Sequence, residues 1–286
     1  MASIWSKNIQ STDMLYYSRS QRFNDTNYKE WFNILGIKEN MKILDVGCAG
    51  GVFTQAIKKH MPSCDVYGID LDETHIKYAK EKALDLGLDV NYQVADIKNL
   101  PFEDNTFDLV FSHTVVEHLP FEHFILEQHR VLKKDGTIKI LYIDNAGKKD
   151  NPFSYNLDKI YNIYNKLEVE KNHQIGTYFR SPEHLLNNLS KYGFVAPNFE
   201  YKRFVYYAPD LRPIEIARQE VELDYVSRRV EAEFMLAKSK NRGDHELNLL
   251  TLLFSRYKRR LEFLANGEKL YDYETTNLII FTAKKG

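Results

Sequence analysis

Short runs of β-forming residues alternate with segments of helical periodicity between Met41 and Ile143. The expected strands are residues 42–46, 65–69, 90–94, 107–111 and 137–143. Between the second and third strands, apolar residues recur at helical spacing from a capping Asp72 to a terminating Gly87. Parallel strands need long crossover connections, which are right-handed in nearly all proteins. The alternation therefore predicts a doubly wound α/β domain, in which ligands bind at the carboxyl ends of the strands.

The pattern changes after Asp144, where a polar segment leads into helices expected at residues 157–167 and 181–192. Strands are expected at residues 194–207 and 277–283, and two long helical patterns, residues 223–237 and 250–264, lie between them. We interpret this helical pair as an αα-hairpin inserted before the last strand, serving either as a lid or as a dimer surface. The expected organisation is an N-terminal helical cap over residues 1–40, a main domain over residues 41–210 and 276–286, and a helical insertion over residues 211–275.

The composition argues against several classes of partner. A formal net charge of −1 at pH 7 provides no overall basic field that would hold nucleic acid by its phosphates. No window approaches about 18 uncharged apolar residues, so we expect no membrane span. The start of the chain lacks the apolar stretch of a signal peptide, and Cys48 and Cys64 are too few for a disulfide framework. These features favour a cytoplasmic protein.

The first expected strand ends in a glycine-rich loop, Ile43 to Gly51, with the sequence ILDVGCAGG. Such a loop brings bare backbone N–H groups and a helix N-terminus close to an anionic or nucleotide-like ligand. The dinucleotide fingerprint would need glycine at position 49 and glycine or alanine at position 52, where this chain has Ala49 and Val52. The lysine of a phosphate-binding P-loop is also missing, so the loop predicts a different nucleoside-containing cofactor.

The loop resembles motif I of class I S-adenosylmethionine-dependent methyltransferases, [D/E]-x-G-x-G-x-G, with Asp45, Gly47, Ala49 and Gly51 at the motif positions. Alanine replaces the middle glycine, and we expect it to fit only with a negative φ. Leu100-Pro101-Phe102, the Phe107-Asp108 approach to the fourth strand and the turn at residues 133–136 are also similar to the family. The resemblance covers residues 41–145, and it extends to residues 178–194 in a weaker form.

The resemblance implies a doubly wound seven-stranded sheet of order 3-2-1-4-5-7-6 with the last strand antiparallel, an N-terminal helical cap and a helical insertion before the last strand. It also implies S-adenosyl-L-methionine as the cofactor and S-adenosyl-L-homocysteine as the product. The cofactor's methionine carboxylate would lie at the helix end in place of a phosphate, and its sulfonium would carry the methyl group. Proximity and exclusion of water would supply most of the acceleration.

Two aspartates follow the second and third strands at family positions. Asp70 is expected to accept hydrogen bonds from both ribose hydroxyls. The alternative role, a helix cap, suits Asp72 better. Asp96 is expected to accept from the adenine amino group while the N–H of Ile97 meets a ring nitrogen; the alternative is an exposed turn aspartate. The full set of expected cofactor contacts is Tyr17, Arg22, Asp45, Gly47, Cys48, Ala49, Gly51, Asp70, Leu71, Asp96, Ile97 and His113.

Candidates for acceptor activation follow the fourth strand. The resemblance assigns a backbone carbonyl at His113 to the methionine amino group, and the imidazole is either a general base or a passive lining group. Glu117 and His118 match a pair common in the family, in which the glutamate belongs to an anion site in some carbon-methylating relatives. His118 is alternatively a structural histidine. Neither the histidines nor the cysteines have metal-ligand spacing, so we expect no metal.

Further candidates lie outside the parallel strands. In related enzymes an N-terminal helix folds over the cofactor, with a Tyr near the sulfonium and an Arg near the carboxylate. Tyr16, Tyr17, Arg19 and Arg22 are candidates for these roles, unless the helix simply packs on the sheet edge. Tyr178 and Arg180, with Tyr16, are candidates for the acceptor pocket. The basic run at residues 256–260 is interpreted as a solvated helix face rather than an RNA-binding patch.

The leading hypothesis is a methyltransferase that transfers a methyl group to O, N or C of a small-molecule acceptor, without metal, membrane or nucleic acid, as a monomer or a homodimer. One alternative is a catalytically silent module that binds S-adenosylmethionine or S-adenosylhomocysteine and recruits a partner through the helical hairpin. Another is a methyltransferase acting on RNA or protein. The tetrad typical of many base and glutamine N-methylating enzymes is missing after the fourth strand, where this chain has Ser112-His113-Thr114-Val115.

Overall fold

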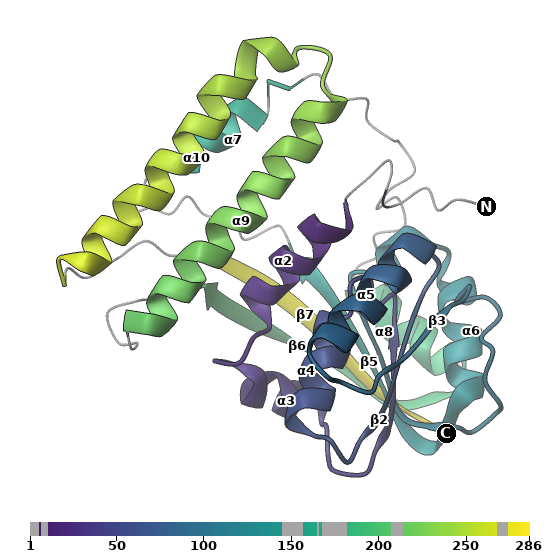
Figure 1. Cartoon of the computed structure of the whole chain (residues 1–286). Coiled ribbons are helices and arrows are strands. Elements are labelled where there is room, and N and C mark those ends of the chain that lie inside the picture. Colours follow the sequence, from purple (N-terminus) through teal and green to yellow (C-terminus); the bar gives the residue numbers. More distant parts are fainter. Residues whose placement is uncertain are drawn as a thin grey trace.

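The fold was established from a computed structural model of the chain (Figure 1). It describes residue 6 and residues 11–144, 157–164, 166–167, 182–206, 214–267 and 274–286. A seven-stranded sheet runs through the main body, and a long helical hairpin projects from one end of it. Among the described residues, no helix is both long enough and apolar enough to cross a membrane.

The strand order is β3-β2-β1-β4-β5-β7-β6, as the family resemblance implied. The first five strands are parallel, and they are β1 (Lys42–Val46), β2 (Asp65–Asp70), β3 (Asn91–Val94), β4 (Phe107–His113) and β5 (Leu132–Asp144). β7 (Glu274–Lys285) is antiparallel to β5 and to β6 (Phe194–Tyr206). The order reverses at β1, so the carboxyl ends of β1 and β4 lie next to each other at the switch point.

Side chains of the central strands alternate between the two faces of the sheet, which is the geometry of any β-strand. Ile43 and Leu109 face a cluster with α3 (Tyr28–Leu35) and α4 (Val52–His60). Leu44 and Val110 face the other cluster, with α6 (Phe121–Val131) and α8 (Pro182–Lys191). These strands are apolar on both faces because helices cover both faces. The doubly wound α/β prediction is therefore confirmed.

The remaining helices complete the cofactor side and the insertion. α5 (Glu73–Asp85) follows β2, and α2 (Thr12–Arg22) lies beside α4 and α5. α9 (Ile214–Lys238) and α10 (Arg242–Ala265) form the hairpin between β6 and β7, with α7 (Leu157–Tyr164) against them (Figure 1). α2 also packs along α9, so the N-terminal helix joins the hairpin to the main body.

Three strands differ from the sequence-based expectation by two or more residues: β4, β5 and β7, which runs over Glu274–Lys285 instead of residues 277–283. β4 continues two residues beyond Phe111, because His113 pairs with Leu141 of β5; His113 therefore lies in the strand and not in the turn after it. β5 begins at Leu132 rather than at Thr137. Phe107 pairs with Leu132 and Leu109 with Thr137, so the predicted turn at residues 133–136 is a bulge within the strand.

Candidate cofactor and active site

The glycine loop turns sharply between β1 and α4. Gly47 and Gly51 have φ values of 75° and 82°, a left-handed region that glycine enters without steric cost. The N–H groups of Gly47 and Cys48 both donate to the carbonyl of Ile69, at 2.8 and 2.9 Å. A Cβ added to Gly51 would overlap the Tyr92 hydroxyl oxygen, so only glycine fits at the start of α4.

Position 49 corrects one expectation about this loop, because the alanine does not have a negative φ. Ala49 has a φ of 47°. The left-handed conformation costs a residue with a Cβ roughly 1–2 kcal/mol. The N–H of Ala49 donates to Oδ2 of Asp70 at 3.0 Å, and this charge-assisted bond helps to hold the turn. Alanine thus reproduces the loop geometry of glycine at an energetic cost.

Asp70, at the end of β2, is positioned by groups on both sides. Its Oδ1 accepts the N–H of Asp72 at 2.9 Å, while Oδ2 accepts from the glycine loop. Buried His75 places Nδ1 3.4 Å from Oδ1 of Asp70 and Nε2 3.8 Å from Oδ2 of Asp72. Asp72 accepts the N–H of Thr74 and caps α5, which confirms the predicted cap. Asp70 is therefore available for a role other than capping.

Asp96 and its neighbours follow β3. The Asp96 carboxylate accepts the N–H of Lys98 at 3.0 Å and lies 3.3 Å from the Lys98 ammonium. The Asp96 and Ile97 side chains are half-buried, whereas Leu71, expected near the cofactor, is 65% exposed. The alternative role of Asp96, a turn aspartate, is thus compatible with its local contacts.

A buried aspartate and a buried arginine lie beneath the loop. Asp45 in β1 is 2% exposed, and burial raises the pKa of its carboxyl to about 8 against the opposing effect of Arg19. Arg19 of α2 is also buried, and its Nη2 donates to the His113 carbonyl and the Thr114 hydroxyl, both at 3.4 Å. Its Nη1 is buried and makes no hydrogen bond within the described residues. Arg19, which the sequence grouped with three other candidates, is the guanidinium that α2 brings to the switch point.

His113 ends β4 in an apolar setting. Its ring stacks obliquely on Phe53, with centroids 5.4 Å apart, and neither ring nitrogen forms a hydrogen bond in the part of the chain that the structure describes. Burial lowers its pKa far below the usual value, and the cations Arg19 and Arg22 lower it further. Such an imidazole stays neutral and is a weak base at physiological pH.

Glu117 and His118 lie in the short 3₁₀ helix Val116–His118 just beyond β4. Burial raises the pKa of Glu117 to about 7, and its buried Oε2 makes no hydrogen bond to any described residue. Burial also lowers the pKa of His118 to about 4. Nε2 of His118 lies 3.9 Å from Oε1 of Glu117. Glu117 can therefore exchange a proton near neutral pH, while His118 remains neutral.

Of the aromatic candidates on α2, Tyr16 lies over the glycine loop. The Tyr16 hydroxyl donates to Oε1 of Gln55 at 3.2 Å. The Tyr16 ring packs against Tyr78 and lies so close to Gly50 that a Cβ at that position would touch it. Tyr17 packs edge-on against Tyr16. Tyr178 and Arg180 lie outside the described residues. The described residues contain no cluster of His, Cys, Asp and Glu that could hold a metal ion.

The basic run at residues 256–260 is not a solvated face as a whole, which corrects the sequence-based interpretation. Lys258 and Arg259 are exposed, but Arg256 and Arg260 are 2% and 1% exposed. Both contact the buried carboxylate of Asp224 on α9, which also accepts from Arg228 at 2.8 Å. Arg256 and Arg260 are four residues apart, so a helix places them on one face. Only the packing of α9 on α10 brings both of them to the Asp224 carboxylate.

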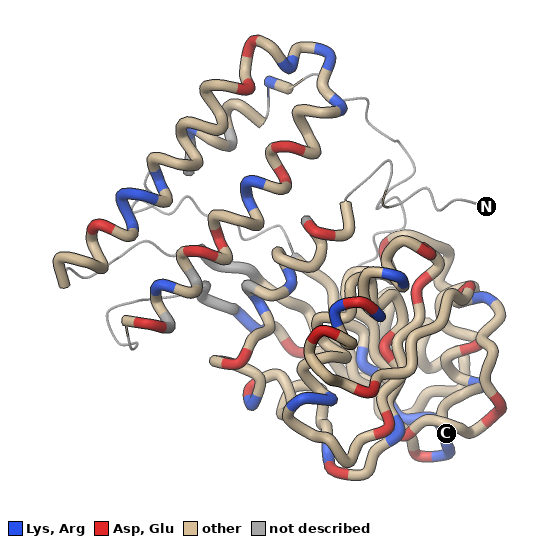
Figure 2. The backbone as a smooth tube through the Cα atoms, viewed as in Figure 1, with Lys and Arg blue, Asp and Glu red and all other residues tan. Residues whose placement is uncertain are grey.

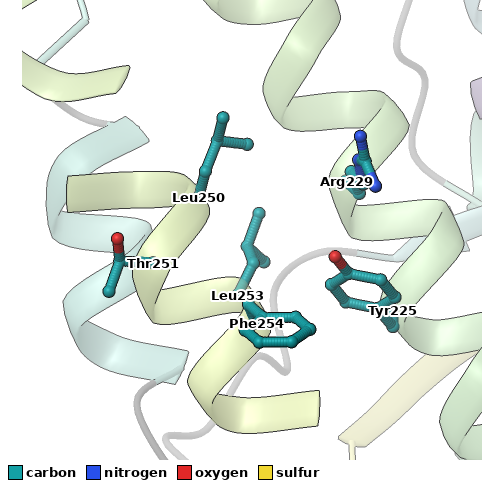
Figure 3. A pocket seen from close by; sticks show the side chains of 6 residues that line it. All are labelled: Tyr225, Arg229, Leu250, Thr251, Leu253 and Phe254. Atoms are coloured by element: carbon teal, nitrogen blue, oxygen red, sulfur yellow. The ribbon is translucent and has the colours of Figure 1, made fainter. Parts of the chain in front are cut away.

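A groove with a volume of about 310 Å³ lies within the hairpin (Figure 3). Its lining residues are Tyr225, Arg229, Leu250, Thr251, Leu253 and Phe254. All six belong to α9 or α10, so the groove is separate from the residues around the glycine loop.

Comparison with known proteins places these features in context. A family model described as a methyltransferase domain matches residues 37–188, more than half of the chain. Phosphoethanolamine N-methyltransferase 3 of Arabidopsis thaliana is 33% identical over 127 residues, which are 43% of this chain and 25% of that protein. Ubiquinone biosynthesis O-methyltransferase of Coxiella burnetii is 35% identical over 94 residues, 33% of this chain and 39% of that protein. The matches thus span less than half of the length of these curated relatives.

Solved structures share the fold. Phosphoethanolamine N-methyltransferase 2 of Haemonchus contortus, in complex with S-adenosyl-L-methionine, has a TM-score of 0.57 at 21% identity, covering 100% of this chain and 60% of that one. The YcgJ protein of Bacillus subtilis has a TM-score of 0.53 at 17% identity, covering 90% of this chain and 97% of that one. At these identities the likeness extends to the fold alone.

Proposed function

Because this chain belongs to the class I S-adenosylmethionine-dependent methyltransferase family, we propose that it transfers a methyl group from S-adenosyl-L-methionine to O, N or C of a small-molecule acceptor. The methyltransferases among its relatives are named for phosphoethanolamine and for ubiquinone biosynthesis, and both support a small acceptor. The two buried free cysteines suit a reducing cytoplasm. The cofactor site belongs to the proposed domain of residues 41–210 and 276–286.

The observation that carries the proposal is the position of Asp70. Its carboxylate lies at the carboxyl end of β2 and accepts an N–H of the glycine loop. A nucleoside bound at the glycine loop would therefore have its sugar close to this carboxylate. We assign the ribose hydroxyls to Asp70 and the adenine to Asp96 and the N–H of Ile97. When bound, the cofactor supplies an electrophilic methyl group on a sulfonium.

The chain's own charges suit the methionine end of that cofactor. The buried Nη1 of Arg19 makes no hydrogen bond within the described residues, and a carboxylate would satisfy it. The His113 carbonyl, to which Arg19 donates at 3.4 Å, is the proposed acceptor for the amino group. Asp45, buried below them, would favour a cationic ligand once its own carboxyl is ionised.

For acceptor activation we assign the proton-accepting role to Glu117 rather than to the His113 imidazole. A general base works best with a pKa near the working pH, and the pKa of Glu117 is about 7 whereas that of His113 is far below its usual value. His113 would line the pocket and exclude water, and neutral His118 would support the loop. Tyr16 and Tyr17 would cover the sulfonium from α2.

Calorimetric titration tests the cofactor assignment. We expect wild-type protein to bind S-adenosyl-L-methionine and not NAD, and Asp70→Ala to weaken this binding about tenfold or more, because a carboxylate that accepts two hydroxyl donors is lost. Asp65→Ala at the other end of β2 is the matched control, since its exposed carboxylate lies far from the loop along the strand. Unchanged affinity in Asp70→Ala would refute the ribose assignment, and absence of binding in the wild type would refute the proposed function.

A further inference from the structure

Helix α10 has a buried face and an opposite face that carries large apolar side chains. Leu249, Leu253, Arg256, Arg260 and Leu264 form the buried face, at helical spacing. On the opposite face, Leu247 is 81% exposed and Phe254 is 49% exposed. Seven residues span almost two helical turns, so these two side chains emerge on the same side.

The surface between Leu247 and Phe254 contains a groove. Leu250 and Thr251 lie midway between them and line the groove with Tyr225 of α9 (Figure 3). The groove therefore adjoins a protruding leucine one turn earlier on the same helix. A surface that carries both a protrusion and a hollow can fit a second copy of itself.

Charges at the two ends of this stripe have opposite signs. Acidic and basic positions both occur along α10 (Figure 2). Asp244 lies three residues before Leu247, and Lys258 lies four residues after Phe254; both are exposed. Helical spacing places both on the side of the apolar stripe. The stripe is thus nearly symmetric about Leu250 and Thr251 in position, but reversed in charge.

We propose that two copies of this chain associate through their α10 helices, antiparallel, about a two-fold axis near Leu250 and Thr251. In this arrangement Leu247 of one copy lies against Phe254 of the other, and Asp244 of one copy lies opposite Lys258 of the other. Each contact occurs twice, as a two-fold interface requires. Antiparallel pairing brings unlike charges together at both ends, whereas parallel pairing would place like charges opposite each other.

Sedimentation velocity over a concentration series, with full-length protein, tests this interface. We expect a wild-type dimer, and a dissociation constant raised about tenfold or more by Asp244→Lys or by Lys258→Asp, because each reversal creates two like-charge contacts per dimer. The double variant, Asp244→Lys with Lys258→Asp, restores the opposite pairing, so its dissociation constant should return close to that of the wild type. Phe254→Asp should dissociate the dimer in all of these backgrounds.

Matched charge reversals on α5 serve as controls. Glu73→Lys lies in the first turn of α5 and Lys80→Asp lies two turns later, both exposed, and neither should change the dissociation constant. Circular dichroism establishes that each variant is folded. A monomeric wild type, a dimer that both α10 reversals leave unchanged, or single-variant losses that the double variant fails to restore would each overturn the proposal. A monomeric wild type would indicate a different partner for the stripe, and the last result would indicate a dimer in which Asp244 and Lys258 do not face each other.

Discussion

Asp45 has an environment very different from that of a free aspartate. It lies in the central strand β1 with its carboxyl enclosed, and Arg19 offsets only part of the cost of burying a charge there. The pKa of about 8 means that folding favours the protonated carboxyl. The motif I acid is therefore neutral in part of the physiological pH range when no cationic ligand is bound.

We expect this carboxyl to make stability depend on pH. Its folded-state pKa lies above its unfolded value of about 4, so its contribution to stability is complete below about pH 4 and is lost as the pH rises towards 8. Asp45→Asn removes this titration. The variant should therefore gain free energy of unfolding relative to wild type between pH 5 and pH 8, by no more than about 1.4 kcal/mol per pH unit.

Urea unfolding at several pH values measures this difference. Glu127→Gln is a useful control, because the hydrogen bond from Arg130, 2.7 Å away, lowers the pKa of the Glu127 carboxyl instead of raising it. It should show no such gain with rising pH. A constant difference between Asp45→Asn and wild type across the range would contradict the assignment of a raised pKa to Asp45.

At the level of the elements, the hairpin is held by charge as well as by apolar contacts. Ala232 and Leu236 of α9 pack on Leu249 and Leu253 of α10, and further along the pair Asp224 joins the two helices through buried arginines. A buried acid surrounded by guanidinium groups is costly to disrupt, because the remaining charges stay in a poorly solvated site. Asp224 thus links one position on α9 to two positions on α10.

Asp224→Ala should lower the free energy of unfolding of the hairpin by about 3–5 kcal/mol. Thermal unfolding and limited proteolysis within residues 214–267 measure the effect. Glu233→Ala, which removes an exposed partner of Arg229 on the same helix, should change stability by no more than about 0.5 kcal/mol. Equal effects of the two substitutions would show that the buried cluster has no special structural role.

At the scale of the whole molecule, and among the described elements, α2 contacts both the main body and the helical hairpin. It contributes Arg19 to the switch point, covers the loop with Tyr16, and packs along α9 of the hairpin. A ligand that binds the loop and Arg19 would therefore stabilise the docked position of α2, and through it that of α9. We therefore expect cofactor binding to be coupled to the order of the hairpin.

Hydrogen exchange with and without S-adenosyl-L-methionine measures this coupling. We expect slower exchange in α2 and α9, by up to about a hundredfold at a ligand concentration about a hundred times the dissociation constant. α6 should change little, because its buried residues belong to the apolar cluster on the opposite face of the sheet. Protection confined to the glycine loop would contradict a coupling through α2.

Local patterns along the chain specify the sheet, the order of its elements and the glycine loop. Strand alternation and helical periodicity involve near neighbours, and right-handed crossovers leave few topologies, so the pattern alone places the strands at residues 42–46 and 65–70 to within one residue. The Asp72 cap is readable for the same reason, since a cap bonds to a residue two positions away. Asp70 can be identified from the sequence because a single helix, α4, separates the glycine loop from the strand that Asp70 ends.

Tertiary packing determines which groups meet across long stretches of chain. Arg19 and Asp45 come together because α2 folds over β1, and Arg256 and Arg260 leave the solvent because Asp224 faces them from another helix. Ala49 has a left-handed conformation, and Asp70 at the end of the next strand helps to hold it by accepting the Ala49 N–H. Burial and charge pairing depend on residues distant in sequence, so no local pattern specifies them, whereas periodicity and capping need only near neighbours.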